Sequence, residues 1–212
     1  MRIRPAVVVL ALAITAASAS GQIIRPGATF QSQTWASVGV GVLQTQNVED
    51  WATTTEWDFG TVVQWRAAIE RTLRNGGSIG LAGALARPSL AYDGVGCAPC
   101  EARANLFQIL AAFRVGGGSG FHQVIELHAG VTGFSNFRRD VDDERLEPNE
   151  TVLDPTFSIG YGFGYGLGQS SQIAIVQEYG AMLHRNDRAP SGANTLRTMS
   201  ATRFGLRIAL GR

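Results

Sequence analysis

The stretch from Thr156 to Leu167 reads TFSIGYGFGYGL, and it decides the fold. Apolar or aromatic side chains take every second position, and Ser158 and four glycines lie between them. A period of two predicts a β-strand, not a helix. One face is a continuous apolar stripe and the other is almost bare backbone. This favours a strand whose large side chains meet lipid and whose inner face borders a tight barrel interior.

The amino terminus has the pattern of an export signal. Arg2 and Arg4 precede the apolar segment 6–17, and Ala17-Ser18-Ala19 is a small-x-small cleavage site. We expect residues 1–19 to be a signal peptide and 20–33 a short periplasmic leader, because the apolar segment is too short to span a bilayer. No second apolar stretch of spanning length follows, so membrane insertion would have to use strands.

Composition excludes some classes of partner. The 212 residues contain 18 basic and 17 acidic residues, and loss of Arg2 and Arg4 leaves one basic residue fewer than acidic ones. Because the charge is near neutral and no basic patch is present, nothing indicates nucleic-acid binding. No cofactor is predicted.

Period-two alternation recurs along residues 34–212 and predicts eight strands of membrane-crossing length. The expected strands are Thr34–Gln44, Trp57–Leu73, Ser78–Arg87, Ala104–Val115, Phe121–Phe134, Thr156–Leu167, Gln172–His184 and Leu196–Leu210. In the second of them, Phe59 is expected on the outward face with Trp65, and Asp58 on the inward face with Arg66. Trp35, Trp57, Trp65, Tyr165 and Tyr179 are candidates for aromatic girdles at the membrane surfaces.

The connections between these strands alternate in length. Three are short and rich in Gly, Ser and Asn, whereas four are long and polar: 46–56, 88–103, 135–151 and the segment before Leu196. Outer-membrane barrels sort their connections in this way, with short turns in the periplasm and long loops outside. The prediction is an all-β, eight-stranded, antiparallel up-and-down transmembrane β-barrel, with both termini in the periplasm.

On this architecture the chain resembles the OmpA/OmpX-like family of eight-stranded outer-membrane barrels, over about residues 34–212. The closing stretch RFGLRIALGR, 203–212, resembles the carboxyl-terminal strand that barrel-assembly machinery recognises, although it ends in Gly211-Arg212 and not in an aromatic residue. The resemblance implies an outer-membrane location, contact with membrane lipid and lipopolysaccharide, and a monomer.

The inward parity of the strands collects charges of both signs. An eight-stranded barrel is just wide enough for side chains to fill it, and buried charges are costly unless paired. An ion-pair network that plugs the lumen is therefore expected, and a selective pore is the alternative. Its members would be Arg66, Glu70, Arg114, Glu126, His128, Glu178, Arg203 and Arg207.

The histidines do not predict a metal site. His122 and His128 share a face with Glu126, but at about 3.3 Å per residue the two histidines lie roughly 20 Å apart. Glu126 and His128 could form a hydrogen-bonded pair. His184, at the loop end of its strand, is expected to be an ordinary surface residue.

Two loop features have a simple and a functional interpretation. Cys97 and Cys100 form a CxxC in an exported protein, and a local disulfide is favoured over redox chemistry or half a zinc site. The acidic segment 135–151 could bind calcium, but its spacing is not that of an EF-hand and a solvated loop is favoured.

No catalytic constellation is apparent, since no His–Ser pair lies in adjacent or same-face register beside a carboxylate. The favoured function is a non-enzymatic outer-membrane barrel with a structural, envelope-integrity or surface-interaction role. A narrow channel for small or apolar solutes, a lipid-modifying barrel enzyme and a soluble lipocalin-like barrel are the alternatives. The exposed apolar band predicted for the strands argues against the soluble barrel.

Overall fold

The computed structural model describes residues 32–74, 76–185 and 194–210. The predicted signal peptide, nearly all of the predicted leader and part of the last long connection lie outside these ranges, so those predictions are not tested. Within the described residues, no helix is long and apolar enough to span a membrane.

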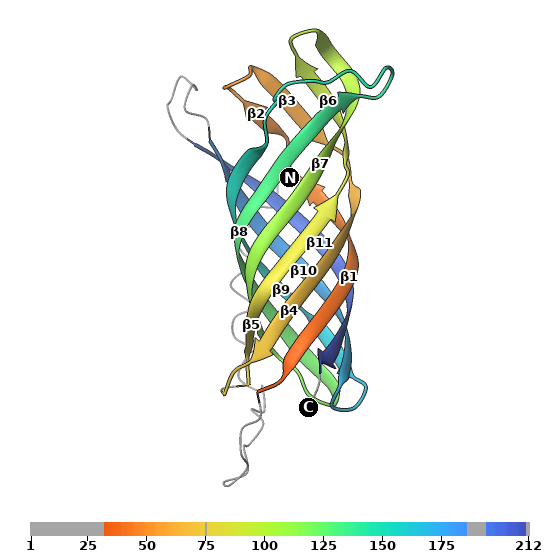
Figure 1. Ribbon diagram of the computed structural model, residues 1–212, viewed down its shortest axis with the longest axis vertical. Helices are drawn as coiled ribbons and strands as arrows, with labels where there is room; N and C mark the ends of the chain where they lie inside the picture. Colours follow the sequence, from red (N-terminus) through yellow and green to blue (C-terminus); the bar gives the residue numbers. More distant parts are fainter. Residues whose placement is uncertain (1–31, 75, 186–193, 211–212) are drawn as a thin grey trace, which may run out of the picture. The chain divides into compact units, whose positions relative to one another are not determined.

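The described chain is all β, and its strands are antiparallel (Figure 1). Eight strands close into a ring in the order β1-β4-β5-β7-β8-β9-β10-β11, and β11 pairs with β1. The strands are β1 (Thr34–Thr45), β2 (Val48–Asp50), β3 (Thr55–Phe59), β4 (Val62–Thr72), β5 (Ser78–Ala86), β6 (Ser89–Gly94), β7 (Cys97–Val115), β8 (Gly120–Arg139), β9 (Val152–Gly166), β10 (Ser171–His184) and β11 (Thr195–Leu210). The predicted eight-stranded up-and-down barrel is confirmed.

Residues Thr156–Gly166 of the stretch TFSIGYGFGYGL lie in β9, and the two faces of this strand differ as predicted. Phe157, Ile159 and Tyr165 are half or more exposed on the outer face, while the alternate positions from Thr156 to Gly166 are buried. Outward apolar residues recur on every strand of the ring, so the barrel carries an apolar outer band. That band and the closed hydrogen-bonded ring are what a lipid-facing barrel requires.

Short turns join β4–β5, β7–β8 and β9–β10 at the end of the barrel where β1 begins and β11 ends; we call this the turn end. The opposite end, which we call the loop end, carries more strand than the sequence predicted. Residues assigned to the loops 46–56 and 88–103 form β2, the start of β3, β6 and the first part of β7, and β8 runs on to Arg139. β2, β3 and β6 pair in series onto β7, so a small sheet extends beyond the ring.

The predicted single strand from Trp57 to Leu73 is broken at Gly60-Thr61 into β3 and β4. Phe59 pairs with Leu90, and Gln64 pairs with Ala86. The chain therefore advances five positions on the β3–β4 side but only four on the β5–β6 side. This extra residue acts as a β-bulge and reverses the alternation. Phe59 is therefore buried and Asp58 is exposed, and the prediction had these two residues on the wrong faces.

An apolar core fills the loop end of the barrel. Its centre is Trp57, which is fully buried and lies 4.6 Å from Phe137 and 5.8 Å from Phe134 between ring centroids. Leu106 and Met182 pack in the same core. The girdle assignment is therefore wrong for Trp57. It is also wrong for Trp35, which is 5% exposed at the turn end.

Candidate functional site

Below the apolar core the lumen is polar, and it contains all eight residues predicted for the charge network. β4 contributes Arg66 and Glu70, β7 contributes Arg114, and β8 contributes Glu126 and His128. β10 contributes Glu178, and β11 contributes Arg203 and Arg207. The strand alternation places these side chains inside, and the ring brings together charges that are far apart in the sequence.

Glu178 lies at the centre of the network. One of its carboxylate oxygens accepts a hydrogen bond from Arg66 Nη1 at 3.0 Å and lies 3.5 Å from Arg203 Nη2. The other accepts a hydrogen bond from the Ser158 hydroxyl at 2.5 Å and lies 3.4 Å from His128 Nδ1. This carboxylate thus holds together side chains from four strands.

Two further ion-paired carboxylates complete the network. Glu126 accepts from Arg114 at 2.8 Å and also pairs with Arg203. Glu70, nearer the turn end, accepts from Arg207 at 2.6 Å and from the Ser78 hydroxyl at 2.7 Å. Charge-assisted bonds of this kind offset the cost of burying a carboxylate.

Inward glycines make room for these long side chains. A Cβ at Gly160 would lie 2.8 Å from Val176 Cγ1 and 3.5 Å from the Cβ of Glu126. At Gly164 a Cβ would lie 2.5 Å from Nε2 of His122. The glycines between the aromatic residues of β9 therefore leave room for the inward side chains of the two neighbouring strands, β8 and β10.

The pair predicted between Glu126 and His128 is not a hydrogen bond, because the nearest nitrogen and oxygen are 3.8 Å apart. His128 instead contacts the Ser158 hydroxyl through Nδ1 at 3.2 Å. One ligand atom each of Glu126, His128 and Glu178 lies within 4.8 Å of the others, and these residue types can bind a metal. Guanidinium groups already engage both carboxylates, so the cluster is organised as an ion-pair network.

The sequence analysis missed the partner of His128. His128 and Ser158 are directly opposite each other on β8 and β9, beside Glu178, so the stated lack of a His–Ser pair near a carboxylate is wrong. All three side chains are buried in the lumen. The serine hydroxyl donates to Glu178, whereas a nucleophilic serine must donate to its histidine. In this structure the hydroxyl proton of Ser158 is therefore directed at Glu178 and not at His128.

His184 is not a surface residue, contrary to the prediction, because it is 1% exposed within the loop-end core. Its Nδ1 lies 2.9 Å from a carboxylate oxygen of Asp154, and its Nε2 lies 4.0 Å from Asp50 on β2. Its ring stands edge-on to Trp57. Continuing the alternation of Glu178 along β10 to position 184 gives the inward face, so this signal was available in the sequence.

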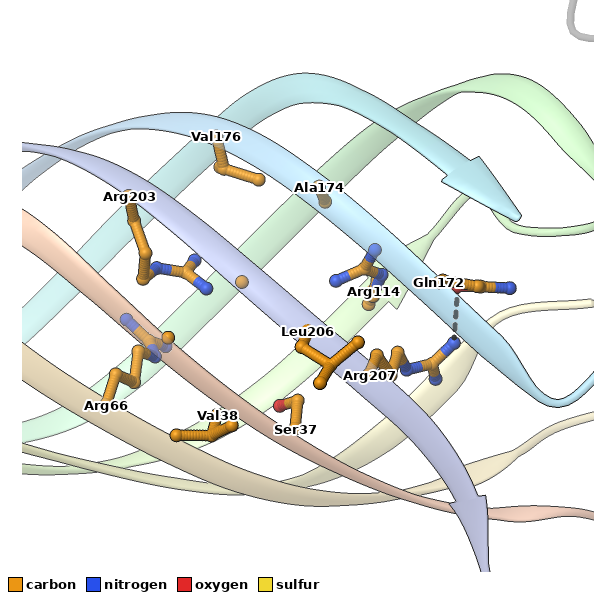
Figure 2. A pocket seen from close by; sticks show the side chains of 12 residues that line it. Ser37, Val38, Arg66, Arg114, Gln172, Ala174, Val176, Arg203, Leu206 and Arg207 are labelled. Atoms are coloured by element: carbon orange, nitrogen blue, oxygen red, sulfur yellow. Dashed lines mark hydrogen bonds between the residues drawn. The ribbon is translucent and has the colours of Figure 1, made fainter. Parts of the chain in front are cut away.

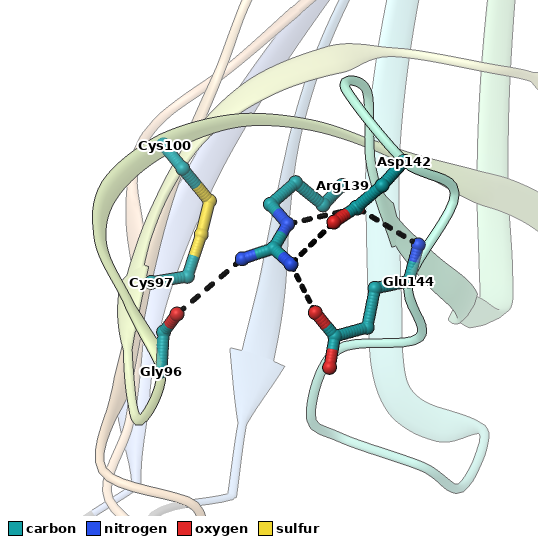
Figure 3. Close-up of a disulfide and its surroundings, with 6 residues drawn as sticks. All are labelled: Gly96, Cys97, Cys100, Arg139, Asp142 and Glu144. Carbon is teal, nitrogen blue, oxygen red and sulfur yellow. Dashed lines mark hydrogen bonds and ion pairs between the residues drawn. A yellow bond between two sulfur atoms is a disulfide. The ribbon is translucent and has the colours of Figure 1, made fainter.

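The loop end outside the barrel carries a disulfide and a second set of ion pairs. Figure 3 shows Cys97 and Cys100 joined at the start of β7, and Arg139 beside them. Arg139 pairs with Asp142 and Glu144 and donates to the Gly96 carbonyl at 3.5 Å. The hydrogen bond to Asp142, with the charges of Asp142 and Glu144, raises the pKa of Arg139, and the hydrogen bond from Arg139 lowers the pKa of Asp142.

Other acidic residues of the segment 135–151 are also paired. Arg103 donates to Asp140 at 2.7 Å and also pairs with Asp143, which Arg138 contacts at 2.9 Å. Because arginines occupy these carboxylates, the segment is not arranged as a calcium loop. Leu146 anchors it to the loop-end core.

No protein-family model and no curated protein matches the sequence. The solved structure of Neisserial surface protein A is similar, with a TM-score of 0.57 at 10% identity, over 84% of this chain and 99% of that protein. The outer-membrane protein OprG from Pseudomonas aeruginosa matches with a TM-score of 0.49 at 12% identity, over 85% of this chain and 97% of that one. The likeness to Neisserial surface protein A shows the fold, which is that of a closed antiparallel barrel of eight strands.

Proposed function

We propose that the protein is an integral outer-membrane barrel with a closed lumen that presents the loop-end sheet to the exterior for a structural or surface-interaction role. The observation that carries this proposal is that two unlike layers fill the barrel. The ion pairs occupy its middle and turn end, and the apolar core around Trp57 closes the loop end.

This filling argues against the channel. A solute would have to displace the contacts of Glu178 and then pass between fully buried rings such as Trp57 and Phe134. Breaking a buried pair costs about 3–5 kcal/mol, and opening the core would add to that cost.

The filling also argues against the enzyme. The Ser158–His128 pair lies inside the same packed network, and neither side chain reaches the lipid-facing surface where a lipid substrate would lie. The role is therefore assigned to the loop-end sheet, which is held by the disulfide and by the arginine pairs around Asp140 and Asp142.

The outward apolar band supports an outer-membrane location in contact with lipid and lipopolysaccharide, as a monomer. The last described strand, β11, pairs with β1 along the whole length of β1 and so closes the ring. This pairing supports assembly by machinery that recognises the carboxyl-terminal strand. The long-connection end would face outside and the turn end the periplasm.

The test combines location, conductance and topology. Membrane fractionation with boiled and unboiled gel samples is expected to give an outer-membrane protein whose mobility shifts on heating. Purified barrel in planar bilayers is expected to give no stepwise conductance, whereas Glu178→Ala/Trp57→Ala, which opens both layers, provides the positive control.

A cysteine placed at Val141, 90% exposed, is expected to react with an impermeant maleimide on intact cells, in a Cys97→Ser/Cys100→Ser background. Steady conductance by the unmodified protein would overturn the closed barrel, and labelling only after lysis would overturn the surface role.

A further inference from the structure

The ion-pair network borders a small cavity that the closed-barrel role does not use. Figure 2 shows its lining, which includes the guanidinium groups of Arg66, Arg114, Arg203 and Arg207. No carboxylate lines it. The volume is about 20 Å³, and since a water needs roughly 10–15 Å³ by this measure, the cavity accommodates one or two atoms of that size.

The backbone explains why a cavity is present at this level. Gly39 on β1 and Gly205 on β11 are directly opposite each other and both lie in the lining. Because neither has a side chain, the wall is set back between the arginines that flank it.

Several of the guanidinium N–H groups have no hydrogen-bond partner within the described protein. They are Arg66 Nη2, Arg114 Nε and Nη2, Arg203 Nε and Arg207 Nε. Arg66, Arg114 and Arg207 are each no more than 6% exposed, so bulk water does not satisfy these donors. An unpaired buried donor on a charged group is costly, and five of them around one cavity indicate that something accepts their hydrogen bonds.

The charge count gives the sign of that acceptor. In this part of the lumen four arginines face three carboxylates, those of Glu70, Glu126 and Glu178. Arg207 and Glu70 balance each other, so Arg66, Arg114 and Arg203 share two carboxylates and leave one positive charge in excess. Asp50, Asp154, His184 and Arg197 belong to the loop-end layer and not to the lining.

We propose that the cavity is a binding site for a single monatomic anion, of which chloride is the natural representative. The anion would accept hydrogen bonds from the free edges of the arginines and neutralise the excess charge. The small volume of the cavity favours a monatomic ion over tetrahedral oxyanions such as phosphate and sulfate.

The first experiment uses the wild-type barrel, crystallised from detergent in sodium bromide, with anomalous diffraction at the bromine edge. The expected result is an anomalous peak in the cavity between Arg66, Arg114 and Arg203. A map with bromide sites elsewhere but only water in the cavity would overturn the proposal.

The second experiment compares thermal unfolding in sodium chloride and in sodium gluconate at equal ionic strength, because gluconate is too large for the cavity. Wild type is expected to unfold higher in chloride, by roughly 3–5 °C for each tenfold rise above the dissociation constant. Equal midpoints in the two salts would contradict the site.

Two variants locate the effect. Arg114→Gln removes two of the five free donors and balances the charges, while Glu126 keeps Arg203, so its midpoint is expected not to depend on the anion. Arg103→Gln removes an arginine outside the lumen and is expected to keep the chloride effect. A chloride effect that persists in Arg114→Gln would place the anion elsewhere. If that variant does not refold, the bromide map still decides.

Discussion

Replacing Glu178 by Gln is the most informative perturbation of the lumen. The side chain keeps its shape and can still accept from the Ser158 hydroxyl, but it loses its charge. Arg66 then has no ion-pair partner, because Glu178 is the carboxylate that it contacts, whereas Arg203 retains Glu126. The middle of the lumen changes from four arginines facing three carboxylates to four facing two.

The expected loss is about 3–5 kcal/mol in the free energy of unfolding, since one uncompensated charge remains buried. In Arg66→Gln/Glu178→Gln both charges are absent and two amides can bond to each other. The double variant is therefore expected to recover at least about 2 kcal/mol relative to Glu178→Gln. Asp140→Asn removes one member of a largely exposed pair and is expected to change stability by no more than about 1 kcal/mol.

The assay is equilibrium urea unfolding of the refolded barrel in lipid vesicles, followed by tryptophan fluorescence and checked by gel mobility. A loss in Glu178→Gln no larger than that in Asp140→Asn would refute the reasoning. So would a double variant whose loss equals the sum of the two single losses, because the charges would then act independently.

Three further outcomes follow from the packing and titration of particular side chains. Trp57→Ala is expected to cost about 3–5 kcal/mol in the same unfolding assay, and the outward Trp65→Ala much less; equal losses would contradict an apolar core at the loop end. Gly160→Val is expected to lose about 1–3 kcal/mol because its Cβ meets Val176, whereas Gly83→Val, with 3.8 Å of clearance, serves as the tolerated control in the same assay. Burial, with the Glu147 carboxylate second, raises the pKa of Tyr92 to about 12, so the neutral phenol contributes stability below pH about 10 that is lost as the pH rises towards 12. Ultraviolet titration of wild type against Tyr92→Phe checks this, and a difference between the two already complete at pH about 10 would contradict it.

The alternation of apolar and polar residues was sufficient to predict the barrel, because a period of two can be recognised in each strand by itself. It also placed Arg66, Glu126 and Glu178 inside, since each lies on an unbroken strand. The alternation predicted the wrong faces for Phe59 and Asp58. The bulge there depends on how β3 and β4 pair with β6 and β5, and the sequence of one strand does not show that pairing.

The loop end was less predictable for a different reason. Gly94 and Pro99 lie within β6 and β7, and Pro88 directly precedes β6. Because Gly and Pro normally mark turns, the local composition did not predict the strands that pairing with β7 and β8 forms here. For His184 the alternation of β10 was sufficient, and the error came from expecting a residue near a strand end to be exposed. The contact between His128 and Ser158 needed the register of β8 against β9, and the long connection 140–151 that joins these strands does not reveal that register.

The bulge at Gly60-Thr61 also bears on how the molecule can change over evolution or in the laboratory. In an uninterrupted barrel strand, one inserted residue would turn every later side chain from lumen to lipid. Here the bulge between β3 and β4 can absorb such a change, since β3 takes its own alternation from β6. Insertions and grafted sequences on the loop-end side of Gly60 should therefore leave the register of Arg66 and Glu70 unchanged, so the loop-end hairpins can be replaced without disturbing the lumen.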